Sequence, residues 1–123
     1  MEEIKQIKSF RDLEVWQLAH SFVLEVYKIT EKFPKNEEYR ITSQLLRAVV
    51  SIPTNIAEGK GRQTLKDYIH FLIIARGSLE ETKYLLFLSK ELSFIGEEKY
   101  FELEETLNTI GKKLNNLINS LKS

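Results

Sequence analysis

The residues of this chain best suited to chemistry form a short basic segment, in which Lys60, Arg62 and Lys66 surround a glycine-rich turn. The segment directly precedes a helix that we expect to begin at Leu65, and the free backbone donors of a helix N-terminus attract phosphate. This turn is therefore the best candidate in the chain for binding nucleic acid. In the alternative interpretation, Lys60 and Arg62 neutralise the C-terminal end of the preceding helix and keep an exposed loop in water.

One carboxylate–histidine pair, Asp67 and His70, has the spacing of metal ligands on adjacent turns of a helix. A di-iron bundle needs two such pairs and two further inward carboxylates, whereas the other histidine, His20, has Gln17 in the matching position. The chain has no cysteine, so a thiolate nucleophile and cysteine-ligated metals are excluded. We therefore expect no enzyme activity, no catalytic residue, no metal site and no cofactor.

Composition predicts one ordinary globular domain, residues 1–123, without bulk charge for a polyanion. The 123 residues carry 18 basic and 18 acidic side chains, so any nucleic-acid site must be a local patch. The N-terminal segment is too polar for a signal peptide, and the longest strongly apolar run, residues 68–75, is too short to span a bilayer. We expect a cytoplasmic protein that does not enter a membrane.

Apolar periodicity and turn signals predict four helices, at about residues 12–33, 37–58, 65–92 and 97–121, and no strand. Pro34 stops the first helix, Asn36 and Thr64 are candidate N-caps, and Gly59 and Gly96 mark turns. Short connections make neighbouring helices antiparallel. The predicted fold class is all-α, an antiparallel up-down-up-down four-helix bundle.

A proline and two glycines inside the predicted helices indicate tight packing. Pro53 removes a backbone donor and displaces the carbonyl of Val49, at a cost of roughly 3 kcal/mol or more. It could instead begin a new helix, but Ile52 would then be an N-cap without a side-chain acceptor, so a single kinked helix is favoured. Gly77 and Gly111 each cost about 1 kcal/mol relative to alanine, which suggests close approach of another helix.

The first and third helices carry more apolar surface than a four-helix monomer can cover. Apolar residues cover about two-thirds of the circumference of the first helix, whereas a helix that faces one core needs an apolar arc of a little over 100°. The third helix is apolar on nearly every side. Either these helices are unusually central or the surplus is a subunit interface, and we favour an interface. Its expected residues are Trp16, Phe22, Phe71 and Ile74.

The other two helices differ from these. The fourth has a narrow apolar stripe, with Glu and Lys elsewhere, formed by Tyr100, Leu103, Leu107, Ile110, Leu114, Leu117 and Leu121. One side of the second helix carries short neutral polar residues, which suit close helix contact with hydrogen bonds across it, or a ligand. Arg40 and Arg47 share this side, and with Arg76 they could follow a phosphate backbone or pair with nearby glutamates.

Several segments resemble the bacterial four-helix-bundle proteins named after intervening sequences in 23S ribosomal RNA genes. The strongest is residues 51–59, SIPTNIAEG, and others are residues 10–16, FRDLEVW, and residues 77–81, GSLEE. Phe33 with Pro34 and Gln44 with Arg47 also agree. The resemblance covers residues 9–95 and extends in fold to the accessory protein of diversity-generating retroelements, which assists a reverse transcriptase.

The resemblance implies a homopentameric ring of antiparallel bundles without enzymatic activity, in a family for which nucleic-acid binding is suspected. This chain departs from the family where two consecutive basic residues are common, because it has Leu46 before Arg47. Two hypotheses follow. In the first, the ring binds RNA or DNA through Lys60, Arg62, Lys66, Arg40 and Arg47; in the second, it is a scaffold for a partner protein and has no nucleic-acid role.

Overall fold

The computed structural model describes residues 9–123, and within this part of the chain all regular structure is helical. The four long helices are α2 (Glu14–Thr30), α3 (Ser43–Lys60), α4 (Leu65–Glu91) and α5 (Glu97–Lys122). Three short elements accompany them: η1 (Phe10–Asp12), η2 (Lys35–Glu37) and η3 (Glu38–Thr42). The all-α class and the four helices are thus confirmed. The polar N-terminal segment that argued against a signal peptide lies outside the described residues.

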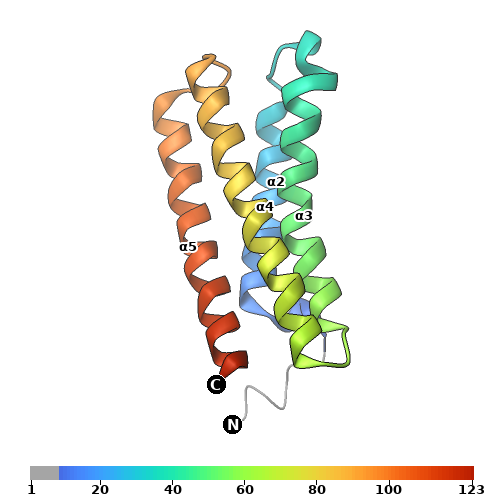
Figure 1. Ribbon diagram of the computed structural model, residues 1–123. Helices are drawn as coiled ribbons and strands as arrows, with labels where there is room; N and C mark the ends of the chain where they lie inside the picture. Colours follow the sequence, from blue (N-terminus) through green and yellow to red (C-terminus); the bar gives the residue numbers. More distant parts are fainter. Residues whose placement is uncertain (1–8) are drawn as a thin grey trace.

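The four helices lie side by side, and the turns that join them alternate between the two ends of the molecule (Figure 1). Helix α3 packs against α2 and α4, and α5 closes the group by contacting α4 and α2. The buried core follows the predicted stripe of α5 as far as Leu114, but Ile118 takes the next core position. Leu117 and Leu121, predicted for the stripe, are only half-buried.

The connection between α2 and α3 departs most from the sequence prediction. Helix α2 ends at Thr30, and Asn36 lies inside the 3-10 turn η2 and caps no helix. The next segment, η3, is a π-helix that leads directly into α3 and buries Ile41. Because Pro34 disfavours helical geometry at the residue before it, the chain must restart its helix after this point. It restarts through two irregular turns and not through a side-chain cap.

Pro53 lies inside one continuous helix, as predicted, and its ring is buried. Two side chains after it donate to carbonyls of the preceding turn: Thr54 Oγ1 to the Val50 carbonyl at 2.8 Å, and Asn55 Nδ2 to the Ser51 carbonyl at 2.8 Å. Proline has no N–H to give to the carbonyl four residues earlier. These side-chain bonds therefore supply extra donors in the turn that the proline interrupts.

The contact between α3 and α4 uses the small polar residues of α3. Ser51 Oγ lies 2.7 Å from Ser78 Oγ of α4 and accepts a second hydrogen bond from Asn55 Nδ2 at 2.9 Å. The predicted hydrogen bonding between closely packed helices thus occurs within one subunit. Gly59 was predicted to break α3, but it lies buried inside the helix, against Tyr68 and Phe71 of α4.

Caps fix both ends of α4. Thr64 is its N-cap, as predicted, and Thr64 Oγ1 accepts a hydrogen bond from the Asp67 N–H at 3.1 Å. At the other end Ser93 adopts φ 67°, and the Phe94 N–H donates to the Ser89 carbonyl at 2.8 Å. This pattern closes a helix with a left-handed residue, a position where glycine is usual.

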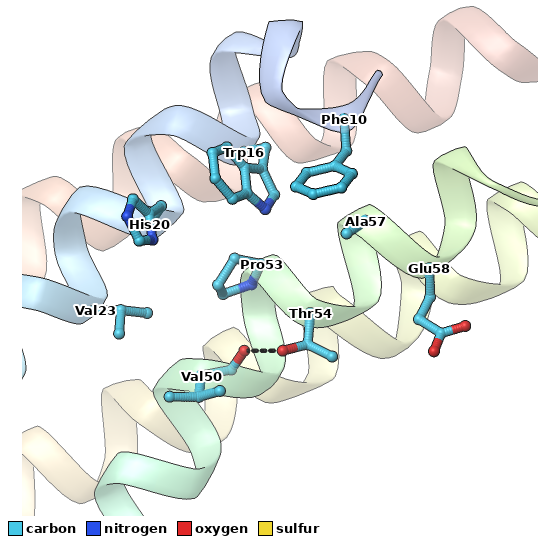
Figure 2. Close-up of a pocket in the computed structure, with 9 residues that line it drawn as sticks. All are labelled: Phe10, Trp16, His20, Val23, Val50, Pro53, Thr54, Ala57 and Glu58. Atoms are coloured by element: carbon cyan, nitrogen blue, oxygen red, sulfur yellow. Dashed lines mark hydrogen bonds between the residues drawn. The ribbon is translucent and has the colours of Figure 1, made fainter.

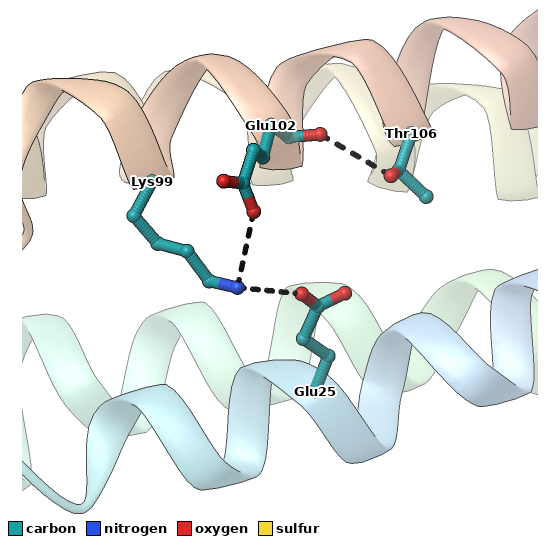
Figure 3. A network of polar contacts seen from close by, with 4 residues as sticks. All are labelled: Glu25, Lys99, Glu102 and Thr106. Atoms are coloured by element: carbon teal, nitrogen blue, oxygen red, sulfur yellow. Dashed lines mark hydrogen bonds and ion pairs between the residues drawn. The ribbon is translucent and has the colours of Figure 1, made fainter.

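A polar network joins α2 to α5 on the outside of the bundle (Figure 3). Lys99 Nζ lies 3.0 Å from a carboxylate oxygen of Glu25 and 3.4 Å from one of Glu102. The hydrogen bond with Glu25 is the main reason that the pKa of Lys99 is raised above its usual value. Because these groups are partly exposed, the pair contributes at most about 1 kcal/mol to stability.

Candidate functional site

The structure separates the five predicted nucleic-acid residues into two groups. Arg40 lies in η3 and Arg47 near the start of α3, whereas Lys60, Arg62 and Lys66 lie at or beyond the end of α3. Thirteen residues of helix separate Arg47 from Lys60, which corresponds to roughly 20 Å along the axis. The predicted cations therefore form two small patches and not one surface.

At the α3–α4 turn, one cation is engaged and two are free. Arg62 pairs with Glu58 at 3.2 Å, and its guanidinium carbon lies 4.5 Å from the centre of the Phe71 ring. Lys60 and Lys66 form no ion pair within residues 9–123. The two lysines can attract phosphate. The ion pair of Arg62 with Glu58 instead fits the alternative interpretation, in which the cations of this turn neutralise the end of α3.

At the other end of α3, Arg40 and Arg47 differ in the same way. Arg40 Nη2 lies 2.6 Å from a carboxylate oxygen of Glu37, so its charge is largely compensated. Arg47 donates to Ser43 Oγ at 2.9 Å and has no carboxylate partner in the described part of the chain. Arg76 does not join either patch, because it donates to Asn115 of α5 at 3.0 Å.

The residues predicted for a subunit interface have different surroundings. Phe22 is 1% exposed and belongs to the core of the bundle, so it has no surface to offer a second subunit and that prediction was wrong. The helical wheel placed it in the broad apolar arc of α2 but could not show which part of the arc faces inward. Ile74 is 38% exposed, and Trp16 and Phe71 are half-buried.

The apolar surplus predicted from the sequence is present, mostly on residues that the prediction did not name. Large apolar side chains with exposed surface occur on α2, before α3, on α4 and on α5: Leu24, Tyr27, Tyr39, Leu65, Ile73, Ile74, Tyr84, Phe87, Leu92 and Phe101. Two of these rings are partly covered by the chain's own Lys90, whose Nζ lies 4.9 Å from the centre of the Phe87 ring and 5.9 Å from that of the Phe101 ring. Within residues 9–123, the exposed side chains of Leu24 and Tyr27 on α2 and of Ile73, Ile74 and Tyr84 on α4 have no such cation contact.

An apolar groove of about 530 Å³ lies between α2 and α3, over the buried Pro53 (Figure 2). Trp16 stacks on His20 along one side, with ring centres 5.0 Å apart and planes 6° from parallel. Phe10 meets Trp16 edge to face at 4.9 Å. A second groove, of about 630 Å³, continues toward the start of α3 and shares Val50 and Thr54 with the first. The outer face of α2 and α3 is thus hollowed along much of its length.

The described residues offer little to catalysis. They contain no cluster of three or more histidine, cysteine or acidic side chains that could hold a metal ion. His70 of the predicted pair meets the edge of the Phe71 ring, with ring centres 5.8 Å apart. Among the described helices, none is both long enough and apolar enough to cross a membrane. What the surface does offer is apolar area, two grooves and two small basic patches.

Tyr27 and Tyr39 were missed by the sequence reasoning, and both line the second groove. The available signal was their position, since they flank the Pro34 connection on its two sides. The spacing of apolar residues along the sequence assigns Tyr27 and Tyr39 only to the apolar arc of a helix or to a loop. It does not show that residues from the two sides of a connection share one groove.

Comparisons with known proteins agree with this fold. The sequence profile of the 23S rRNA-intervening sequence proteins matches residues 11–116. The structure is similar to the crystal structure of a protein of unknown function from the S23 ribosomal protein family of Bacteroides thetaiotaomicron VPI-5482. The TM-score is 0.79 at 27% sequence identity, over 85% of this chain and 95% of the other. No curated protein sequence matches the chain.

Proposed function

The chain belongs to the 23S rRNA-intervening sequence protein family, and we propose that it is a non-enzymatic subunit of a homo-oligomeric ring that binds RNA or DNA. In this proposal each subunit is an antiparallel up-down-up-down bundle. The family resemblance supports five subunits, and the absence of cysteine fits a cytoplasmic location. Other copies of the chain and nucleic acid are then its partners.

Assembly rests on one observation, the apolar area that remains exposed on the separate subunit. Ile73, Ile74 and Tyr84 lie on α4, and Leu24 lies on α2, all with exposed side chains. Covering apolar side chains such as these is favourable by about 25 cal/mol per Å². Two different apolar faces on one chain suit head-to-tail contacts, which close into a ring.

Nucleic-acid binding is assigned to the α3–α4 turn. Lys60 and Lys66 have no acidic partner in the described residues, and Arg62 lies between them. One subunit offers too few cations for strong binding, but a ring repeats the turn on every copy and multiplies a weak contact. Arg47 adds a second, separate cation at the other end of α3.

Sedimentation of the purified protein tests the assembly. Five copies of a 14.4 kDa chain give a particle of about 72 kDa. Ile74→Asp should shift the distribution toward smaller species, because it places a charge on an apolar contact face. Lys112→Asp, on the exposed side of α5, is the matched control and should leave it unchanged. A folded wild-type protein that sediments only as a monomer would remove the ring.

Binding of a structured RNA at two salt concentrations tests the nucleic-acid role. Neutralising Lys60 and Lys66 to glutamine should weaken binding and flatten its salt dependence, since each lost phosphate contact lowers the slope by about one. Lys112→Gln with Lys122→Gln removes the same charge from α5 and should have little effect. No detectable binding at low salt excludes this role.

The second candidate function is a scaffold for a partner protein without nucleic acid. It is favoured by zero net charge, by Leu46 in place of a basic residue, and by the ion pairs that engage Arg40 and Arg62. A pull-down with this protein tests the scaffold function. If it captures the same partner protein from a lysate before and after nuclease treatment, and itself binds no RNA, the scaffold function is favoured over nucleic-acid binding.

A further inference from the structure

The second groove, at the start of α3, combines aromatic surface with one available cation. We call it the tyrosine groove; it has a volume of about 630 Å³, and its walls include Tyr27 of α2, Tyr39 of η3, and Leu46, Arg47 and Val50 of α3. This volume lies within the range of ligand sites, which are mostly apolar with a few placed polar groups. The groove is therefore large enough for a planar ligand and its substituents.

The two tyrosines present their rings to solvent. Tyr39 is 89% exposed and Tyr27 is 48% exposed. Neither hydroxyl makes a hydrogen bond within residues 9–123, so the rings are not held by a polar contact of the subunit itself. Exposed aromatic rings of this kind serve as stacking surfaces for the bases of single-stranded nucleic acids, since every base has a flat apolar face.

Arg47 is the available cation of the groove. Its only side-chain hydrogen bond within the described chain goes to Ser43 Oγ at 2.9 Å, which leaves further guanidinium donors for a phosphate oxygen. Arg40 is occupied by Glu37, and the carboxylate of Glu38 also lines the groove. The local charge is therefore nearly balanced, and we expect stacking to provide more of the affinity than charge.

Two features in the wall of the groove lower the stability of the fold. Residues 38–42 form a π-helix, a rare conformation that appears frequently at functional sites. In the same segment Thr42 Oγ1 is buried and has no hydrogen-bond partner within residues 9–123, an arrangement that costs stability. Both features lie beside the exposed tyrosines, and together they mark this groove above the other surface depressions.

We propose that the tyrosine groove binds an unpaired base of single-stranded RNA. The base stacks on Tyr39 and Tyr27, and Arg47 contacts a neighbouring phosphate. This proposal rests on the proposed nucleic-acid function and specifies it further, because a base inside a duplex cannot reach the groove. Since one phosphate contact is involved, the groove adds only about 0.7 to the salt slope of single-strand binding.

Fluorescence anisotropy with a labelled short oligouridylate, and with a duplex RNA of the same length, tests the proposal. Tyr39→Ala should weaken single-strand binding roughly five- to 150-fold, the range for loss of one stacked base. Binding of the duplex should not change. Tyr39→Phe keeps the ring and should bind as the wild type does. Phe101→Ala removes an aromatic ring that is 53% exposed on α5, outside the groove and outside the proposed assembly faces, and should also have no effect.

The outcomes separate this proposal from the proposed function. If the Lys60 and Lys66 variant weakens binding while Tyr39→Ala does not, the groove proposal is overturned and the nucleic-acid role stands. If the wild type binds neither RNA, both are overturned. If Tyr39→Ala changes sedimentation, the groove is covered by a second copy in the assembly and cannot be the base site.

Discussion

The close packing of α3 on α4 at Gly59 gives the sharpest quantitative prediction. A methyl group added at Gly59 would lie 3.0 Å from Phe71 Cβ, 3.1 Å from Tyr68 Cδ1 and 3.1 Å from the Tyr68 carbonyl oxygen. Two of these three atoms belong to the backbone or to a Cβ, so they cannot rotate away. At Gly111 of α5 the nearest atoms are the tips of Leu79, at 3.8 and 3.9 Å, which is ordinary contact.

The two positions differ in packing but share the benefit of alanine in a helix. Alanine is favoured over glycine by about 1 kcal/mol inside a helix, and overpacking a fitted contact costs about 1–3 kcal/mol. Gly111→Ala should therefore raise the free energy of unfolding by about 1 kcal/mol. Gly59→Ala should leave it unchanged or lower it by up to about 2 kcal/mol. The helix benefit cancels in the comparison, so the difference of about 1–3 kcal/mol reports the packing alone.

Urea unfolding followed by circular dichroism measures this difference, with all variants at one protein concentration because assembly would shift apparent stability. For a chain of 123 residues, 1 kcal/mol corresponds to about 4 °C in Tm, so thermal melts should separate the variants by about 4–12 °C. If Gly59→Ala were as stable as Gly111→Ala, the argument that α4 approaches too closely for a side chain would be wrong.

Three further predictions concern local features. Thr64→Ala should lower the free energy of unfolding by about 0.5–2 kcal/mol, measured in urea, because α4 loses its N-cap bond. Ser93→Gly should raise it by roughly 1 kcal/mol in the same assay, because glycine adopts φ 67° without strain. Finally, burial raises the pKa of Tyr68 above its usual 10.0, and burial with a hydrogen bond to Glu104 raises that of Tyr100. The folded state therefore holds these protons more tightly, so stability should be constant below pH 10 and fall as the pH rises further; an unchanged urea midpoint above that pH would contradict this.

Most helix positions and the Thr64 cap were predictable because they depend on local sequence, whereas Asn36, the other predicted cap, caps no helix. The α5 stripe, the Thr64 cap and the interior Pro53 all follow from residue spacing or from a short-range side-chain bond. Irregular turns were not predictable in the same way. Nothing local signals the π-helix at residues 38–42, and Ser93 takes a left-handed conformation that glycine normally marks.

The candidate site was harder to predict because it depends on which helix faces meet. Gly77 and Gly111 were expected at close helix contacts, but a methyl group at Gly77 would have no described atom within 4 Å. The close contact is instead at Gly59, which the sequence reading took for a helix break. Likewise, the apolar arc of α2 includes both the buried Phe22 and the exposed Leu24, and only the neighbouring helices decide between them.

The π-helix that precedes α3 also affects how this chain can diverge. Each residue of a helix advances the chain by about 100°, so loss of Arg40 or Thr42, which lie between Tyr39 and α3, would allow an ordinary helical turn to form there. The buried residues of α3 would keep their register, while Tyr39 would rotate about a quarter of a circle away from its groove. A single codon deletion can thus change the aromatic surface at this end of the bundle and leave the core intact.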